Sequence, residues 1–245
     1  MATPDYSKYE HFLISQPIPF VTHVEINRPK KFNAFIESMW LEFGRLFDTL
    51  SVDPNVRAII LSGVGDKAFT TGLDVQSASA GMEARKGDVA RVARGIIRGA
   101  GVFQRCISAA ERCEKPVICV MHGHSLGLAI DIACCTDIRV CASDTKFAVK
   151  EVDIGMAADI GTLSRLPKLV GSFGWCKDVC LTARIFGPEE ALRQGFVSAV
   201  EKDKESAVKR AVEIARTLAE KSPIAVSGTK EILNKARDQS IEESE

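Results

Sequence analysis

The chain has 245 residues, of which 46% are hydrophobic and 26% are charged, and its 32 basic residues balance its 32 acidic ones. This length and composition are typical of a globular protein with a sizeable core, and they exclude extensive disorder. A net charge of zero provides no overall attraction for nucleic acid or for an anionic membrane, so we expect neither as a partner unless a local basic patch supplies one.

The lack of a recognisable targeting signal and the pattern of cysteines lead us to expect an intracellular protein. No apolar run approaches the length of a membrane span, and the polar start MATPDYSKYEHF does not resemble a secretory signal or a transit peptide. The cysteines form no CxxC pair and lie mostly in apolar segments. We therefore expect buried, reduced thiols rather than disulfides or a metal site at Cys106, Cys113, Cys119, Cys134, Cys135, Cys141, Cys176 and Cys180.

Strand and helix patterns alternate along the first half of the chain. Residues 20–26 alternate like a strand, and apolar residues at helical spacing predict a helix over 36–50. Residues 57–63 have the composition of a buried strand. Asp88 is expected to cap a long helix that reaches about Cys113.

Helices dominate the second half. Residues 117–121 predict a buried strand that leads into a helix of small residues over 126–134, and Ser222-Pro223 is expected to open a final helix. The other predicted elements are short strands at 138–141 and 147–149 and helices at 161–169, 173–183, 188–194 and 204–221. This order predicts an α/β fold with a largely parallel sheet, crossover helices and a helical C-terminal part.

Three carboxylates lie in unusually apolar surroundings. Asp131 follows Leu-Gly-Leu-Ala-Ile, Asp159 follows Gly-Met-Ala-Ala, and Glu151 lies between them. An ionised carboxylate is costly to bury without partners, so such groups pair, shift their pKa or take part in chemistry. One such acid alone would be interpreted as a helix cap. Three acids near small-residue turns indicate a site that transfers protons.

Two turns could present backbone amides to an anionic oxygen. Residues 67–74, KAFTTGLD, follow a buried strand, and residues 122–129, HGHSLGLA, connect a strand to a helix. The free N–H groups and positive dipole at a helix N-terminus are suited to an oxyanion. His122 and His124 have no third ligand at a suitable spacing, so no metal site is expected.

Long stretches of the chain resemble one family. The segment PVICVMHGHSLGLAIDIACCTDIRVCASDTKFAVKEVDIGMAADIGTLSRLPKLVG, together with NRPKKFNAF and KAFTTGLDV, resembles the enoyl-CoA hydratase/isomerase (crotonase) superfamily from about residue 10 to the end. The resemblance implies a crotonase-like spiral of ββα units over 1–190. It also implies a C-terminal helical region over 191–245 that assembles trimers and closes the active site, and whose end is expected to be incomplete.

The resemblance also implies which groups bind the substrate. Members bind acyl-CoA thioesters and hold the enolate oxygen between two backbone N–H groups, here those of Thr71 and Leu128. Relatives carry glycine at the second position, so Leu128 is expected to add bulk against the thioester. The neighbouring positions implied to contact the substrate are Thr70, Gly72, Leu73, Asp74, Gly127 and Ala129.

The three acids distinguish subfamilies. A hydratase would carry glutamate at positions 131 and 151 and glycine at 159. The set Asp131, Glu151 and Asp159 resembles the subfamily that isomerises 3,5-dienoyl-CoA to 2,4-dienoyl-CoA in fatty-acid β-oxidation. The resemblance assigns Asp159 to the proton at C2, Glu151 to the proton at C6, and Asp131 to polar support near the diene. No metal or redox cofactor is expected, and CoA is part of the substrate.

The resemblance further implies a homotrimer or a dimer of trimers located in the peroxisome or mitochondrion. An enoyl-CoA hydratase or another acyl-CoA isomerase is the alternative within the family. A non-catalytic or RNA-binding relative is the alternative of a different class. Leu128 favours this last alternative, whereas the zero net charge and the retained acids oppose it.

Overall fold

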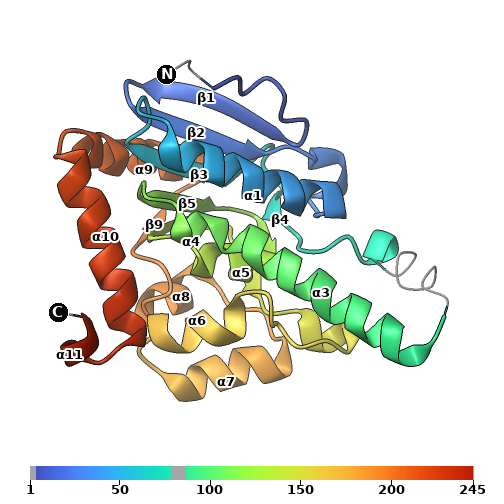
Figure 1. Ribbon diagram of the computed structural model, residues 1–245. Coiled ribbons are helices and arrows are strands. Elements are labelled where there is room, and N and C mark those ends of the chain that lie inside the picture. Colours follow the sequence, from blue (N-terminus) through green and yellow to red (C-terminus); the bar gives the residue numbers. More distant parts are fainter. Residues whose placement is uncertain (1–3, 79–86, 245) are drawn as a thin grey trace.

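The computed structural model describes residues 4–78 and 87–244, in which two β-sheets are surrounded by helices (Figure 1). Within these residues the larger sheet has six strands in the order β1-β2-β3-β5-β7-β9, and the smaller has three in the order β4-β6-β8. Only β1 and β2 pair antiparallel among these strands. The larger sheet consists of β1 (Phe12–Ile18), β2 (Val21–Ile26), β3 (Ala58–Gly63), β5 (Val117–Met121), β7 (Ile138–Ala142) and β9 (Ala199–Glu201), and the smaller of β4 (Ala68–Thr70), β6 (His124–Leu126) and β8 (Lys146–Ala148).

From β3 onward, consecutive strands alternate between the two sheets. In the pairs β3/β4, β5/β6 and β7/β8, the first strand joins the larger sheet and the second joins the smaller one. Helical segments follow each pair before the chain returns to the larger sheet. The central strand β3 is buried along its whole length because both faces of the sheet are covered. The predicted spiral of ββα units is therefore confirmed.

The helices begin and end close to the predicted positions. The Asp88 carboxylate accepts a hydrogen bond from the Arg91 N–H, and the Ser222 hydroxyl accepts one from the Ala225 N–H, so both predicted caps are confirmed. The helices are α1 (Glu37–Val52), α3 (Val89–Ile107), α4 (Ala109–Arg112), α5 (Leu128–Cys134), α6 (Thr162–Leu169), α7 (Phe173–Thr182), α8 (Pro188–Arg193), α9 (Lys204–Ala219), α10 (Pro223–Asp238) and α11 (Ile241–Ser244), with 3₁₀ turns η1 (Pro29–Lys31) and η2 (Glu151–Ile154).

Helices α1 and α9 cover opposite faces of the larger sheet (Figure 1). The buried residues of α9 are alanines spaced four residues apart, and their side chains pack with Ile60 and Val120 of the sheet. The row is Ala207, Ala211, Ala215 and Ala219. Small side chains on one stripe let the helix axis approach the strands closely. The alternate residue Ile59 points into the main core, with Phe43 of α1.

The sequence patterns missed several short elements. Strands β1, β4, β6 and β9 were not predicted, and the helix expected from residue 126 begins at Leu128, because 124–126 pair with β4 and β8. The long helix expected to reach Cys113 is divided into α3 and α4 at Ser108. Strands β4, β6 and β9 have three residues each, too few for an alternation to be recognised. Strand β1 has seven residues, but it is an edge strand with a register shift and a proline near its end.

The boundary expected at residue 190 also differs from the structure. Strand β9 pairs with β7, and α9 covers the sheet, so both belong to the core domain. Helix α10 leaves the sheet and runs down the side of the molecule (Figure 1). The described part of the C-terminal region outside the core is thus α10 and α11.

The cysteines have the state expected of buried thiols. All eight are free, and all except the half-buried Cys106 are buried. Burial raises the pKa of Cys119, Cys135 and Cys141 to about 12, so these thiols remain protonated. Among the residues described, no helix has the length and apolarity needed to span a bilayer.

Candidate active site

Asp131 projects from α5 into the protein interior. Its side chain is almost fully buried, and its Oδ1 accepts three hydrogen bonds from the start of α6. The donors are the Gly161 N–H at 2.8 Å, the Thr162 N–H at 2.7 Å and the Thr162 hydroxyl at 2.8 Å. These bonds join α6 to α5 and hold the Asp131 carboxyl in one orientation.

Glu151 begins η2 and lies beside the turn that precedes α5. A Cβ atom at Gly127 would lie 3.2 Å from Glu151 Oε1, which places the two groups side by side. The other oxygen, Oε2, is buried and receives no hydrogen bond from the described residues. Burial, reinforced by the charge of Asp131, raises the pKa of Glu151 to about 7. Glu151 therefore exchanges its proton near neutral pH.

Asp131 and Glu151 form a carboxyl pair. The Glu151 carboxyl is within hydrogen-bonding reach of the Asp131 carboxyl, and neither group has a cationic partner among the described ion pairs. Burial also raises the pKa of Asp131, against the opposing effect of its three hydrogen bonds. Two adjacent carboxyl groups without a cation share one proton rather than ionise together.

Asp159 lies in the loop that leads into α6, with its side chain exposed to solvent. Its charge contributes to the raised pKa of Asp131, and Asp159 lies two residues before Gly161, whose N–H binds the Asp131 carboxyl. Its carbonyl accepts a hydrogen bond of 3.0 Å from Gln104 Nε2 of α3, which ties the loop to that helix. The structure thus places Asp159 on the solvent side, in the loop that leads to the residues binding Asp131.

Leu128 supplies one of the two predicted amide donors. It is the first residue of α5, a position at which the backbone N–H has no partner inside the helix. Gly127 before it adopts a φ of +54°, which suits glycine. The Leu128 side chain is only 3% exposed and packs in the main core. The Leu128 side chain is therefore part of the core, and the expectation that it adds bulk against the thioester stays a prediction.

The second predicted amide, that of Thr71, is already occupied. The Thr71 N–H donates to the carbonyl oxygen of Phe32 at 3.1 Å, and the Thr71 hydroxyl points to the same oxygen. An amide that already donates in the fold is not available to a thioester oxygen. The assignment of Thr71 as an oxyanion donor is thus contradicted.

The free amide of this turn belongs to Leu73. The Phe35 N–H donates to the Gly72 carbonyl and the Asp74 N–H donates to the Phe35 carbonyl, both at 2.8 Å, so the Leu73 N–H between them has no acceptor among the described residues. A Cβ atom at Gly72 would lie 3.2 Å from the Leu128 nitrogen. The two turns are therefore in contact, with the amides of Leu73 and Leu128 as the available donors.

Other positions expected to touch the substrate have structural roles. Thr70 is fully buried, and its hydroxyl donates to the Asn33 carbonyl and accepts the Gly72 N–H. Ala129 is also fully buried, in the main core. The side chains of Thr70 and Ala129 are thus inaccessible to a substrate, which corrects the prediction for both.

Asp74 acts as a local anchor at the edge of the site. Its carboxylate forms an ion pair of 2.8 Å with Arg28 and accepts the Ser77 N–H at 3.1 Å. The hydrogen bond from Arg28 is the main reason that the pKa of Asp74 lies below its usual value. Asp74 thus caps the turn that follows it and pairs with Arg28 in the fold.

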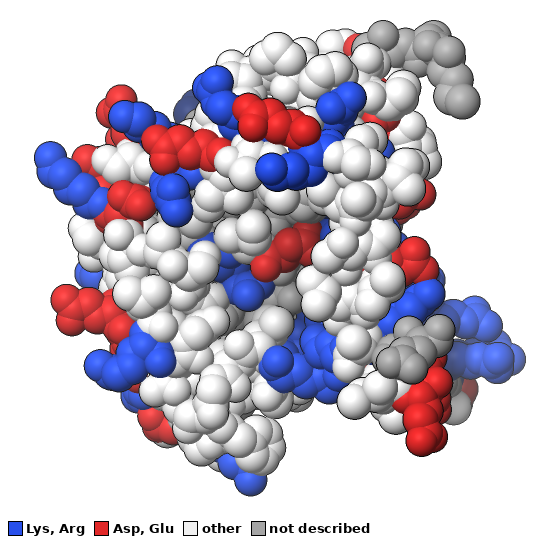
Figure 2. Space-filling view, turned by 90° about the vertical axis from the view of Figure 1, so that its left-hand side faces the viewer, with Lys and Arg blue, Asp and Glu red and all other residues white. Residues whose placement is uncertain are grey.

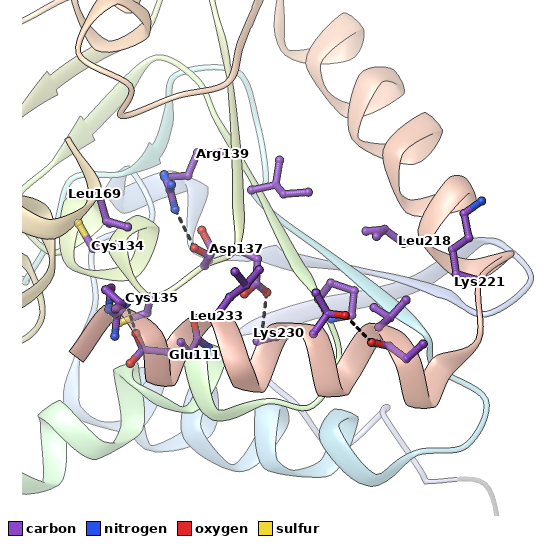
Figure 3. Close-up of a pocket in the computed structure, with 18 residues that line it drawn as sticks. Glu111, Cys134, Cys135, Asp137, Arg139, Leu169, Leu218, Lys221, Lys230 and Leu233 are labelled. Carbon is purple, nitrogen blue, oxygen red and sulfur yellow. Dashed lines mark hydrogen bonds and ion pairs between the residues drawn. The ribbon is translucent and has the colours of Figure 1, made fainter. Parts of the chain in front are cut away.

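A separate cavity of about 740 Å³ lies beneath α10, away from the three acids. Its walls come from α10, the end of α5 and strand β7, and Lys230 reaches from α10 to Asp137 (Figure 3). Figure 2 shows the same side of the molecule, hollowed near its centre, with acidic and basic side chains inside the hollow. None of the residues that line this cavity is one of the predicted site residues.

The two histidines of the 122–129 turn do not act together. His122 Nε2 lies 2.9 Å from the Gly65 carbonyl, and burial lowers the pKa of His122 to about 4. His124 lies edge-on to the ring of Phe32. In the described parts of the chain, no group of three or more His, Cys, Asp or Glu side chains is arranged to hold a metal ion.

Comparison with known proteins gives a consistent result. A family model described as Enoyl-CoA hydratase/isomerase matches residues 20–245. The mitochondrial Delta(3,5)-Delta(2,4)-dienoyl-CoA isomerase of Homo sapiens is 42% identical over 245 residues, which cover 98% of this chain and 73% of the human protein. The peroxisomal protein of the same name from Arabidopsis thaliana is 39% identical over 225 residues, or 91% of this chain and 80% of the plant protein.

Among solved structures, an enoyl-CoA hydratase from Bacillus anthracis superposes with a TM-score of 0.86 at 23% identity. The match covers 96% of this chain and 86% of the bacterial chain. At this identity the likeness establishes the fold alone.

Proposed function

The chain belongs to the enoyl-CoA hydratase/isomerase family, and we propose that it converts 3,5-dienoyl-CoA thioesters into 2,4-dienoyl-CoA thioesters. The observation that supports the proposal is that Asp159 lies in the loop leading into α6, whose first residues bind Asp131, the neighbour of Glu151. Moving a diene by one carbon removes a proton at C2 and returns one at C6. These positions are several bonds apart, so two separately placed acid–base groups are needed.

The amides of Leu73 and Leu128 would bind the thioester oxygen. When Asp159 removes the proton from C2, the electron pair is delocalised over the diene and the negative charge accumulates on that oxygen. Two backbone N–H groups aimed at this oxygen stabilise the dienolate more than the neutral thioester, and one such donor contributes about 3–4 kcal/mol in comparable sites.

Glu151 would complete the reaction by giving its proton to C6. After this step Asp159 holds the proton taken from C2, and Glu151 has lost the proton given to C6. The enzyme returns to its starting state when Asp159 releases its proton to solvent and Glu151 takes one up. The reaction changes neither the number of electrons nor the number of protons in the substrate. It therefore needs no redox cofactor. The amides of Leu73 and Leu128 would stabilise the oxyanion in place of a metal ion, and CoA enters as part of the substrate.

The proposal is tested by following the ultraviolet spectrum of 3,5-dienoyl-CoA, because conjugation of the diene with the thioester changes its absorption. Asp159→Asn should lower kcat at least 100-fold. Asp153→Asn is the matched control, because Asp153 lies in the same stretch but is exposed and paired with Lys150, and this variant should retain activity. Retention of activity by Asp159→Asn would contradict the assignment.

Hydration of 2-enoyl-CoA is the second candidate, favoured by the adjacency of Asp131 and Glu151, which could hold a water molecule between them. Formation of 3-hydroxyacyl-CoA without any diene shift would select this candidate over the isomerase. The non-catalytic alternative rests on Leu128, whose side chain lies in the core and whose backbone N–H has no partner inside α5. Salt-sensitive retention on RNA would support that alternative.

We also propose that the protein forms a homotrimer or a dimer of trimers and acts in mitochondria or peroxisomes. Several apolar side chains of α7 and α10 are more than half exposed, which supports burial against another subunit. They are Phe173, Leu181, Ile224, Ile232 and Leu233. Light scattering of the full chain tests the assembly, and cell fractionation tests the compartment.

A further inference from the structure

The two oxygens of the Asp131 carboxyl have very different surroundings. Oδ1 accepts all three hydrogen bonds from Gly161 and Thr162, whereas none of the hydrogen bonds from the described amide and hydroxyl groups goes to Oδ2. A Cβ atom at Gly161 would lie 3.1 Å from the Asp131 carbonyl oxygen and 3.3 Å from the Asp131 Cβ. Glycine at this position therefore allows the start of α6 to approach α5 closely enough to make these bonds.

Hydrogen bonds donated to a carboxylate favour its ionised form. The two amides carry the partial positive charge of the α6 N-terminus, and the Thr162 hydroxyl adds a third donor inside the protein. Glu151 has no comparable set of donors. The amides of Lys150 and Glu151 favour its ionised form, but burial and the charge of Asp131 outweigh them. The donors therefore distinguish the two members of the pair.

We propose that Thr162 is a positioning residue: its hydroxyl keeps Asp131 as the ionised member of the pair, so that the shared proton stays on Glu151. This inference rests on the proposed function, in which Glu151 delivers a proton to C6. Thr162 is fully buried and touches the reaction only through Asp131. Its role is to select which of two neighbouring acids carries the proton.

The other groups around the pair do not make this selection. The charge of Asp159 opposes ionisation of Asp131. The thiols of Cys134 and Cys180 are neutral, because burial raises their pKa. The nearby cations are engaged elsewhere: Arg165 pairs with Glu111, and Lys150 pairs with Asp153 and the Ala183 carbonyl. The start of α6 is thus the part of the described structure that favours the Asp131 anion.

The location of the proton can be measured without substrate. Difference infrared spectra of the full-length protein near pH 6.5 should contain the carbonyl band of a protonated carboxylic acid. This band should disappear in Glu151→Gln and persist in Asp131→Asn, with its titration moved to lower pH. A band that survives in Glu151→Gln and is lost in Asp131→Asn would place the proton on Asp131 and overturn the proposal.

Thr162→Val removes the hydroxyl and keeps the backbone N–H and most of the side-chain shape. Loss of a hydrogen bond to a charged group should shift the proton distribution toward Asp131, by about tenfold. We expect the infrared band to divide between the two carboxyl groups. Because about half of the molecules would then carry the proton on Asp131, kcat should fall about twofold with little change in KM. The acidic limb of the kcat/KM profile should move to higher pH, because the Asp131 anion has lost a donor.

Thr162→Ser retains the hydroxyl and should restore the wild-type rate, pH profile and infrared band. If Thr162→Val and Thr162→Ser behave alike, the hydroxyl has no such role. Should Thr162→Val fail to fold, the infrared comparison of wild type, Glu151→Gln and Asp131→Asn still decides the location of the proton. A wild-type protein that shows the expected band but does not isomerise dienoyl-CoA would contradict the proposed function and leave the proton assignment standing.

Discussion

Buried carboxylates lie near both ends of α5, and their partners differ. Near its start, Asp131 and Glu151 lie beside each other with hydrogen-bond donors but no cation. Beyond its end, Asp137 pairs with Lys230 at 2.8 Å. The second region is an ion-pair network, whereas the first is a pair of like groups.

The same network continues at Glu111, which pairs with Arg165 at 2.6 Å and Arg237 at 2.8 Å. Burial alone would raise the pKa of Glu111, but the two arginines outweigh this effect and the pKa lies below its usual value. Glu151 has no such counter-ion, and its pKa rises to about 7. Burial also raises the pKa of Asp137 despite its pair with Lys230, so a raised pKa alone does not identify a proton-transferring acid. What distinguishes Glu151 is that it has no counter-ion among the described ion pairs.

The largest expected effect tests whether Glu151, the acid without a cation, takes part in catalysis. Glu151→Gln removes the proton donor to C6 and should lower kcat at least 100-fold, the usual contribution of a general acid. The fold should be retained, because the amide replaces a side chain that is protonated for much of its time at neutral pH. The rate of diene isomerisation and a thermal melt measure the two properties. A variant that loses stability but keeps its rate would place Glu151 with the structural acids.

Lys230→Met tests whether the ion pair between Lys230 and Asp137 stabilises the fold. Lys230 is only 8% exposed and binds Asp137 and the carbonyls of Ala110 and Lys115, so its removal leaves a half-buried carboxylate without its cation. We expect a loss of about 3–5 kcal/mol in the free energy of unfolding, with unchanged kcat for the folded fraction.

The matched control for this variant is Lys235→Met on the exposed side of the same helix. Lys235 forms a solvent-exposed pair with Glu231, and its loss should change the free energy of unfolding by less than about 1 kcal/mol. Urea denaturation measures both variants. Equal destabilisation by the two changes would show that the network beneath α10 has no special importance.

The pH dependence should also separate the two regions. The usual pKa of Glu151 is 4.5 and its folded value is about 7, so folding favours the protonated form. This contribution to stability is fully present below pH 4.5 and is lost as the pH rises through about 7, and it amounts to roughly 3 kcal/mol. Isomerase activity should fall over the same range near pH 7, because Glu151 loses the proton it must donate.

Denaturation of wild type and Glu151→Gln at pH 5 and pH 8 isolates this contribution. The buried His122, whose pKa is lowered to about 4, affects both proteins equally and cancels in the difference. The stability difference between the two proteins should change with pH in the stated direction. A difference that is constant between pH 5 and pH 8 would show that Glu151 is not perturbed.

The smallest effect concerns the third acid. Gln104→Ala removes the hydrogen bond from α3 to the Asp159 carbonyl and should loosen the loop that carries Asp159. Because the bond is close to solvent, we expect kcat to fall only a few-fold. Gln104→Glu keeps the length of the side chain but removes the donor, and it should behave like the alanine variant. An unchanged rate in both variants would show that the loop is held by other contacts.

Much of the fold and the acid set could be predicted from the sequence. Hydrophobic periodicity located the long helices, and the apolar surroundings of Asp131 and Asp159 identified them as unusual before any coordinates were known. The free amide of Leu73 could not be found in this way. The N–H of Thr71 donates its hydrogen bond to the carbonyl of Phe32, which lies 39 positions away along the chain. No local pattern reveals which amide a distant carbonyl has already taken.

By itself, the sequence determined which residues can be buried, where the main helices run and which acids stand among apolar neighbours, because these properties depend on side-chain chemistry and on spacing along the chain. The tertiary structure alone decided which acids meet a cation, which backbone amides remain free and that Thr162 contacts Asp131. Charges and hydrogen bonds act over a few ångströms in space, and the fold brings together groups that the sequence keeps apart.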